Sequence, residues 1–147
     1  LCVECHMPGR VYMGADYRPD HSFRIPDPAL SAAIGAPDAC LRCHVDQDTE
    51  WSQKSMQEWY GPGQKSHYGA VIARARQGDP DAAPDLLRLS QDILYPVIVR
   101  ATALSLLANY PGVETTQAME IALMDEEALI RRTAVTSIFV PEQENLA

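Results

Sequence analysis

Two five-residue strings constrain this chain more than any other feature of its sequence. All four cysteines and two of the four histidines lie in them, because the pattern C-x-x-C-H occurs at residues 2–6 and again at residues 40–44. This pattern is the attachment motif of a c-type haem. In that chemistry two thiols add to the vinyl groups of the porphyrin, and the adjacent imidazole binds the iron. The two motifs therefore predict two covalently attached haem c groups.

The motif assigns a role to each of its residues. A two-residue spacer on a helical turn places both sulfurs along one edge of the ring, and the next residue brings its imidazole under the iron. We expect the four cysteines to be thioether anchors and the two motif histidines to be proximal iron ligands. The anchors are Cys2, Cys5, Cys40 and Cys43, and the proximal ligands are His6 and His44.

Three other uses of the cysteines compete with haem attachment. A four-cysteine zinc site uses similar pairs, but its usual loop of about 15–20 residues is much shorter than the 34 residues between Cys5 and Cys40. Zinc also leaves the two matched histidines unexplained. A thioredoxin-like redox pair needs a βαβ context that the sequence does not suggest. A disulfide framework leaves the repeated C-x-x-C-H pattern to chance.

The two remaining histidines equal the number of irons that still lack a second axial ligand. His21 and His67 each follow one of the motifs, and neutral imidazole is a common iron ligand. We therefore expect both to be distal ligands, with their pairing open; the alternative is a histidine at the surface or satisfied in a core. Methionine is the second choice of ligand. Met7 adjoins His6 and cannot easily reach the opposite face, whereas Met13 can.

Charge and composition exclude several classes of protein. The chain has 147 residues, of which 46% are hydrophobic and 22% charged, and its formal net charge is −8. This composition indicates a globular chain of one domain or two small ones. The acidic balance argues against nucleic acid as a partner, and no apolar run is long enough for a membrane span. A basic redox partner would suit this charge.

The character of the sequence changes near residue 62. Residues 1–63 hold all four cysteines and are rich in prolines and aromatic residues. They predict short turns and one longer helix, at about 46–60, which ends at Gly61, Pro62 and Gly63. We interpret them as an irregular dihaem cytochrome c segment wrapped on its haems, because such a segment cannot form a large core from side chains alone. Arg10, Arg18, Arg24 and Arg42 are candidate partners for haem propionates, or ordinary surface arginines.

Residues 64–147 predict an all-α domain, which makes the whole chain mainly α. Helices are expected near 67–77, 81–91, 96–109, 113–124 and 126–138. The stretches 99–104 and 130–135 resemble each other at an offset of 31 residues, which suits a short HEAT-like array of helical hairpins. Such an array offers a concave partner-binding surface. The alternative is a helical cap that packs against the haem segment.

The first segment resembles the C-terminal haem-binding segment of bacterial multihaem cytochromes c, a group that includes the pentahaem nitrite reductases and their non-catalytic relatives. The residues that carry the resemblance are 2–8, 12–13, 20–26, 40–44 and 59–62. The helical remainder is more loosely similar to the repeat-bearing tails of some of these proteins. The resemblance implies that His6 and His44 are proximal ligands and that His21 is a distal ligand. It also implies that a distal ligand can serve a haem whose motif lies elsewhere in a longer chain.

These patterns favour an electron carrier over an enzyme. An iron with two imidazole ligands has no open position for a substrate and can only change its oxidation state. The catalytic haem of the resembled family carries a lysine in place of the motif histidine, and neither motif here does. The alternatives are a fragment of a nitrite or hydroxylamine reductase with one open haem, and a haem-bearing scaffold that binds proteins.

The location and the parent protein follow from the same motifs. C-x-x-C-H haems are attached outside the cytoplasm, so we expect a bacterial periplasmic or extracellular protein. The sequence has no secretory signal and starts directly before the first motif. We therefore expect a piece of a larger multihaem protein, whose partners are redox proteins or other haem domains of the same chain.

Overall fold

The structure, a computed structural model, describes residues 2–61 and 67–138. It divides into a first unit that ends at His67 and a second unit that begins at Tyr68. The boundary expected between residues 63 and 64, together with Pro62 and Gly63 of the expected helix stop, lies outside the described residues. In the part of the chain that is described, no helix is long and apolar enough to cross a membrane.

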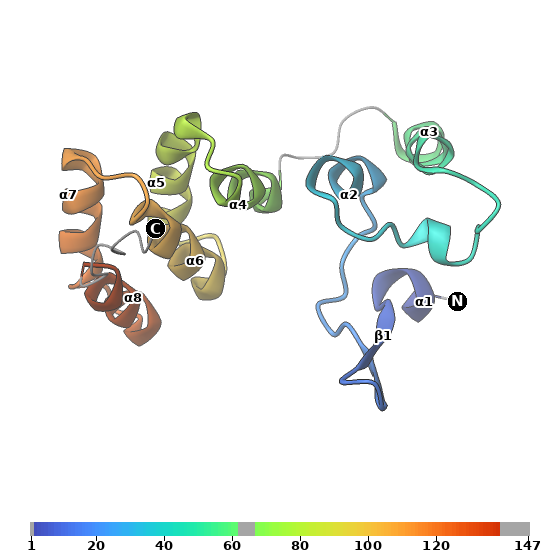
Figure 1. Ribbon diagram of the computed structural model, residues 1–147, viewed down its shortest axis with the longest axis horizontal. Coiled ribbons are helices and arrows are strands. Elements are labelled where there is room, and N and C mark those ends of the chain that lie inside the picture. Colours follow the sequence, from blue (N-terminus) through green and yellow to red (C-terminus); the bar gives the residue numbers. More distant parts are fainter. Residues whose placement is uncertain (1, 62–66, 139–147) are drawn as a thin grey trace, which may run out of the picture. The chain divides into compact units, whose positions relative to one another are not determined.

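The first unit consists of short elements joined by turns (Figure 1). Side-chain caps fix its two longer helices, because Asp27 and Asp48 each accept a hydrogen bond from the first-turn backbone of the helix that follows. Gly35 and Gly61 end these helices with positive φ angles of 69° and 84°. The elements are α1 (Cys2–His6), β1 (Gly9–Tyr12), β2 (Asp16–Pro19), α2 (Pro28–Ile34), η1 (Cys40–Arg42) and α3 (Thr49–Tyr60).

Strands β1 and β2 form an antiparallel hairpin that the sequence did not predict. The register pairs Gly9 with Pro19 and Arg10 with Arg18. Met13 and Gly14, at the tip, have φ angles of 50° and 77°, as the primed turns of tight hairpins require. The expectation of short turns in this part of the chain is therefore incomplete, since a hairpin and helix α2 also occur there.

The first unit has almost no interior. Among residues 2–61 only Gly9, Pro28 and Ser52 are buried, and all residues of the hydrophobic core belong to the second unit. Large apolar side chains that would normally form a core are exposed instead. They are Val3, Val11, Tyr12, Met13, Tyr17, Phe23, Ile25, Val45, Trp59 and Tyr60. Side chains of this unit alone therefore bury little apolar area, which is the main source of stability in small domains.

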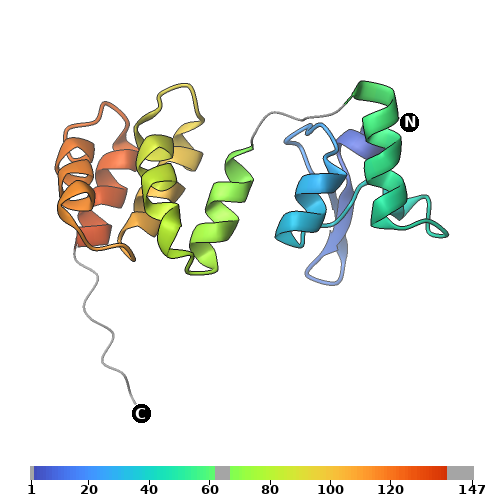
Figure 2. The same ribbon diagram turned by 90° about the horizontal axis from the view of Figure 1, so that it is seen from above.

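The second unit is a stack of helices, and each helix expected after residue 66 is present. Pro80, Pro96 and Pro111 stand at or next to the boundaries between helices, where a ring that cannot donate a backbone hydrogen bond is tolerated. Figure 2 shows the helices side by side. They are α4 (Tyr68–Arg76), η2 (Pro80–Ala82), α5 (Ala83–Gln91), α6 (Val97–Leu107), α7 (Val113–Ala122) and α8 (Ala128–Ile138). Together with the first unit they make the chain mainly helical, as expected.

Helices α5 to α8 form two hairpins that repeat along the chain. Helix α5 packs on α6 and α7 packs on α8, and the equivalent helices of the two hairpins also contact each other, α5 with α7 and α6 with α8. Helices α6 and α8 have the same length and start 31 residues apart. Val99 and Ala103 of α6 are buried, as are Ile130 and Ala134 at the equivalent positions of α8. The sequence similarity therefore corresponds to a repeat of structure.

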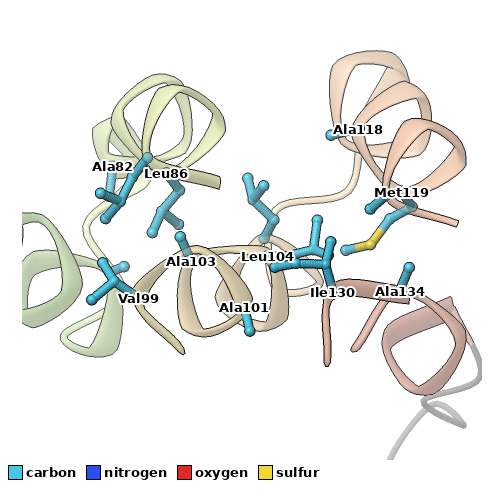
Figure 3. Packing of buried hydrophobic residues seen from close by; sticks show 14 residues of the cluster. Ala82, Leu86, Val99, Ala101, Ala103, Leu104, Ala118, Met119, Ile130 and Ala134 are labelled. Carbon is cyan, nitrogen blue, oxygen red and sulfur yellow. The ribbon is translucent and has the colours of Figure 1, made fainter. Parts of the chain in front are cut away.

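The core of the second unit lies between the two rows of helices. Figure 3 shows Leu86, Ala103, Leu104, Met119 and Ile130 directed toward this interior from α5, α6, α7 and α8. Leu86 and Ala103 are completely buried. Burying a leucine side chain stabilises a fold by about 1.5–3 kcal/mol, so this unit has a driving force for folding that the first unit lacks.

An ion pair between a buried arginine and a half-buried aspartate joins the two hairpins. The Arg100 guanidinium donates to the Asp125 carboxylate at 2.5 Å and to the Ser90 carbonyl at 3.2 Å. Burial would raise the pKa of Asp125, but the backbone N–H of Glu127 and the Arg100 guanidinium outweigh it and lower that pKa. The charged form of Asp125 is thus favoured by folding.

We expect Asp125→Asn to lower the free energy of unfolding of the full chain by about 2 kcal/mol, because the Arg100 charge is then left buried without a counter-charge. Denaturant unfolding followed by far-UV circular dichroism measures this. Since the folded pKa of Asp125 lies below the unfolded value of about 3.9, its contribution is complete above that pH and is lost as pH falls through the folded pKa.

Glu126→Gln is the matched control, because it removes the same charge from an exposed neighbour in the same loop. It should change the free energy of unfolding by less than about 0.5 kcal/mol. Equal effects of the two substitutions would mean that the ion pair does not join the hairpins.

Candidate functional site

Both C-x-x-C-H motifs fold as helical turns. In α1, Cys2 and Cys5 are three residues apart and so lie on one face of the helix. In the second motif the backbone N–H groups of Cys43 and His44 both donate to the Cys40 carbonyl, at 3.2 and 3.0 Å. The four thiols are free of disulfide bonds, and all are exposed except the half-buried Cys40. Each motif thus presents its sulfurs from a single turn, as the haem interpretation requires.

The imidazole of His6 is fixed by a backbone carbonyl. Its Nδ1 lies 2.8 Å from the carbonyl oxygen of Arg24. A carbonyl can only accept, so Nδ1 carries the proton and the lone pair is on Nε2. The backbone N–H of Arg24 in turn donates to the His6 carbonyl at 3.1 Å. A hydrogen bond of this kind fixes the tautomer and the ring orientation of a histidine that ligates a metal through its other nitrogen.

Phe23 holds the same imidazole from its face. The two rings are stacked, with centroids 5.0 Å apart and planes 10° from parallel. Phe23 has a φ of 47°, in the left-handed region that a bulky residue rarely adopts. Backbone strain of this kind persists where the surrounding structure holds it, and it is concentrated at functional sites. The strained residue places its own ring, and the carbonyl that follows it, against His6.

His44 is held differently. Its ring lies 4.7 Å from the Trp51 ring of α3, with the planes tilted by 46°. Within residues 2–61 and 67–138 no hydrogen bond to the His44 ring is found. The two motif histidines therefore have unlike surroundings, one with a hydrogen-bonded and stacked ring and one with an aromatic contact only.

Asp38 anchors the second motif to α3. One of its carboxylate oxygens accepts from the Cys40 backbone N–H at 2.8 Å, and the other accepts from the hydroxyl of Ser52 at 2.5 Å. Ser52 is completely buried. Burial, together with the Asp38 carboxylate and the Cys5 thiol, raises the pKa of Cys40 to about 11. Cys40 is therefore protonated at neutral pH and is a poor thiolate for disulfide exchange.

The two motifs lie close to each other. Cys5 of the first motif is among the groups that act on the thiol of Cys40 in the second. The Arg42 guanidinium, also in the second motif, donates to the carbonyl of Gly9 in β1 at 2.5 Å. An open cavity of about 440 Å³ is lined by residues of both motifs and of the hairpin, including Val3, Arg42 and Cys43. Its volume is within the range of ligand sites.

Gly9 is a point of close approach in this cavity. A Cβ atom at this position would lie 2.4 Å from the Tyr17 ring, well inside van der Waals contact. Because Gly9 has no side chain, the Tyr17 ring lies directly over the strand backbone. No local pattern in the sequence indicates this contact, which joins diagonal neighbours on the two strands, because Gly9 pairs with Pro19 and Tyr17 pairs with Val11.

The two candidate distal ligands lie in different surroundings. His21 is exposed in the turn after β2, where the Ser22 backbone N–H donates to the Asp20 carboxylate at 2.8 Å. His67 is half-buried at the end of the first unit. Its burial, with a smaller effect of the Arg24 guanidinium, lowers its pKa, which favours the neutral imidazole that can bind a metal. Their pairing with an iron stays a prediction.

The two methionines considered as alternative ligands are also in different places. Met13 is at the tip of the hairpin with 87% of its surface exposed. Met7 lines the cavity between the motifs, next to His6 in the chain.

Three of the four candidate propionate arginines have a partner inside the unit. Arg42 donates to Gly9 as described, Arg24 to the Ser22 hydroxyl at 3.0 Å, and Arg18 to the Asp16 carboxylate at 2.7 Å. Arg10 lies directly opposite Arg18 across the hairpin. Like charges opposite each other destabilise a strand pair. Arg18 already pairs with Asp16, so a further carboxylate would be stabilising beside Arg10.

Four groups contribute to the site although the sequence did not predict their roles: Phe23, the Arg24 carbonyl, Asp38 and Ser52. A signal for Asp38 was present, since an aspartate two residues before a helical turn is a common cap. No local pattern connects Phe23 with His6.

Within the described ranges, no three His, Cys, Asp or Glu side chains are grouped so that they could hold a metal ion. Comparisons with protein-family models, with curated proteins and with solved structures found no match to this chain.

We expect Asp38→Ala to lower the free energy of unfolding by about 1 kcal/mol, because it removes the cap of Cys40 and the nearer of the two acceptors of the buried Ser52 hydroxyl, leaving the Thr49 carbonyl at 3.0 Å. Trp51 and Trp59 both belong to α3, so denaturant unfolding followed by tryptophan fluorescence reports this part of the chain. Asp46→Ala removes an exposed carboxylate of the same segment and should have little effect. A stability loss no larger than that of Asp46→Ala would show that Asp38 does not anchor the motif.

Proposed function

We propose that this chain is an electron-transfer module of a c-type cytochrome with two covalently attached haems, each iron held by two histidines. It would work as part of a larger multihaem protein in the bacterial periplasm or outside the cell. Its partners would be redox proteins or other haem domains of the same parent chain. The alternative outcomes are a fragment of a nitrite or hydroxylamine reductase with one open haem, and a haem-bearing scaffold.

One observation carries the proposal. Two complete C-x-x-C-H motifs, both folded as helical turns, lie together in a unit whose apolar side chains are mostly exposed. Tyr12, Tyr17 and Phe23 belong to the hairpin and to the loop that follows it, near the first motif. Two porphyrins would supply the apolar surface that these side chains need, in the way that bound metals stabilise other small domains.

The residues present fit a haem. Because Nδ1 of His6 carries the proton, Nε2 would be available to bind the iron. Phe23 stacks on the imidazole and sets its plane. Arg10 and Arg18 provide positive charge for a propionate. When bound, haem supplies a one-electron couple between ferric and ferrous iron. The chain's own contribution is to hold the ring, orient the imidazole and exclude water with apolar side chains.

Closed coordination distinguishes a carrier from an enzyme. With His6 and His44 as proximal ligands and His21 and His67 as distal ligands, each iron would have two imidazoles and no position for a substrate. Two neutral imidazoles also keep the potential lower than a histidine and methionine pair does. The lowered pKa of His67 supports its role, because an iron ligand must be neutral.

The second unit would be a short HEAT-like array attached to the haem segment. The support is the 31-residue repeat of two stacked hairpins preceded by the single helix α4. Arrays of this kind need about three repeats for stability, so packing of α4 on α5 and α6 would complete the end of the stack.

The test is the absorption spectrum of the full chain, matured with a haem-attachment system, in its ferric and dithionite-reduced forms. We expect two low-spin c-type haems per chain that do not change with nitrite or cyanide. His67→Ala and His21→Ala should each give one haem a high-spin component that binds cyanide, because an axial imidazole is lost.

Met13→Ala is the control, since Met13 is the alternative ligand, and it should leave both haems low-spin. A high-spin component in the unaltered chain would contradict closed coordination and favour the reductase. A chain without haem after maturation would overturn the proposal, and zinc binding would then be the favoured role of the cysteines.

A further inference from the structure

The second unit has a groove that lies outside the unit holding the two C-x-x-C-H motifs. Its volume is about 400 Å³, and it follows α6 and α8 with one residue of α4. Equivalent helices of the two hairpins form its floor, so their exposed side chains recur with the repeat. The polar residues that line it are Arg76, Thr102, Ser105, Arg132, Thr133 and Thr136.

The two arginines in the groove differ from the others in the unit. Among the described residues, Arg76 and Arg132 have neither an ion pair nor a hydrogen bond from their guanidinium groups, and both are exposed. Among residues 67–138 no carboxylate lines the groove, although this range contains nine acidic residues and six arginines. The remaining four arginines each bind a carboxylate or carbonyl in the structure: Arg74, Arg88, Arg100 and Arg131.

Two threonine hydroxyl groups of the groove already donate their protons within their own helices. Thr102 and Thr133, which occupy equivalent positions of α6 and α8, donate their protons to the carbonyls of Ile98 and Leu129 at 2.7 and 2.8 Å. Their oxygen lone pairs are left to accept from a donor. A peptide backbone offers N–H donors, whereas a nucleic-acid backbone offers phosphate oxygens that only accept.

We propose that this groove binds an extended acidic segment of a partner protein. Arg76 and Arg132 would each bind a carboxylate of the segment, and Thr102 and Thr133 would accept from its backbone N–H groups. Repeat arrays bind partners along such surfaces. The positive charge of the groove within an acidic unit selects an acidic segment over a basic one.

Fluorescence anisotropy of the full chain with a labelled short peptide of alternating Glu and Ala tests the proposal. We expect saturable binding that weakens as salt is added. The same peptide with Gln in place of Glu should not bind. Arg76→Gln and Arg132→Gln should each weaken binding about three- to fivefold, which corresponds to the loss of one exposed ion pair.

Arg88→Gln is the matched control, because it removes the same charge from an exposed site outside the groove. It should leave the affinity unchanged, and circular dichroism should show that all three variants are folded. The proposal is overturned if the Glu peptide does not bind, if the double variant of the groove arginines binds as well as the unaltered chain, or if Arg88→Gln has the same effect. Tighter binding of a single-stranded oligonucleotide than of the Glu peptide would also overturn it.

Discussion

The shortage of buried apolar surface in the first unit is the constraint on which the rest of this structure depends. Residues 2–61 bury only Gly9, Pro28 and Ser52, while their aromatic and aliphatic side chains are exposed. A segment of this length needs additional apolar contacts, a disulfide or a metal group to fold stably. Its four thiols form no disulfide and lie in two C-x-x-C-H motifs, and covalent haem is the addition that we propose.

The site shows how a small unit without a core can still orient a side chain. His6 is held by a carbonyl on one edge and by a stacked phenyl ring on its face, and both come from the adjacent residues Phe23 and Arg24. Phe23 has a strained backbone conformation, with a positive φ, in the position where it holds His6. The second motif relies instead on Asp38 and the buried Ser52, which fix its first cysteine to α3. The second unit folds on its own apolar core. Its groove is lined by two arginines, although the unit as a whole is acidic.

The features that could be predicted from the sequence depend on interactions between residues near each other in the chain, whereas the features that were missed depend on contacts between distant residues. The motifs and the helices of the second unit were predictable because their signals are local: fixed cysteine spacing, apolar periodicity and prolines between helices. The hairpin was not predictable, because β1 and β2 are only four residues long each and their residues are almost all exposed. The Phe23 contact with His6 joins residues that are distant in the chain. Such contacts depend on the folded backbone, so no local pattern announces them.

Hydrogen–deuterium exchange of the full chain, with and without attached haem, tests the dependence of the first unit on haem most directly. We predict that the amides of α1, α3 and the hairpin exchange slowly only in the chain that carries haem, because haem would supply the apolar contacts that stabilise this unit against opening. The amides of α5 to α8 should exchange equally slowly in both forms. Equal protection of the first unit in the two forms would contradict the account, since that unit would then be stable through its own side chains.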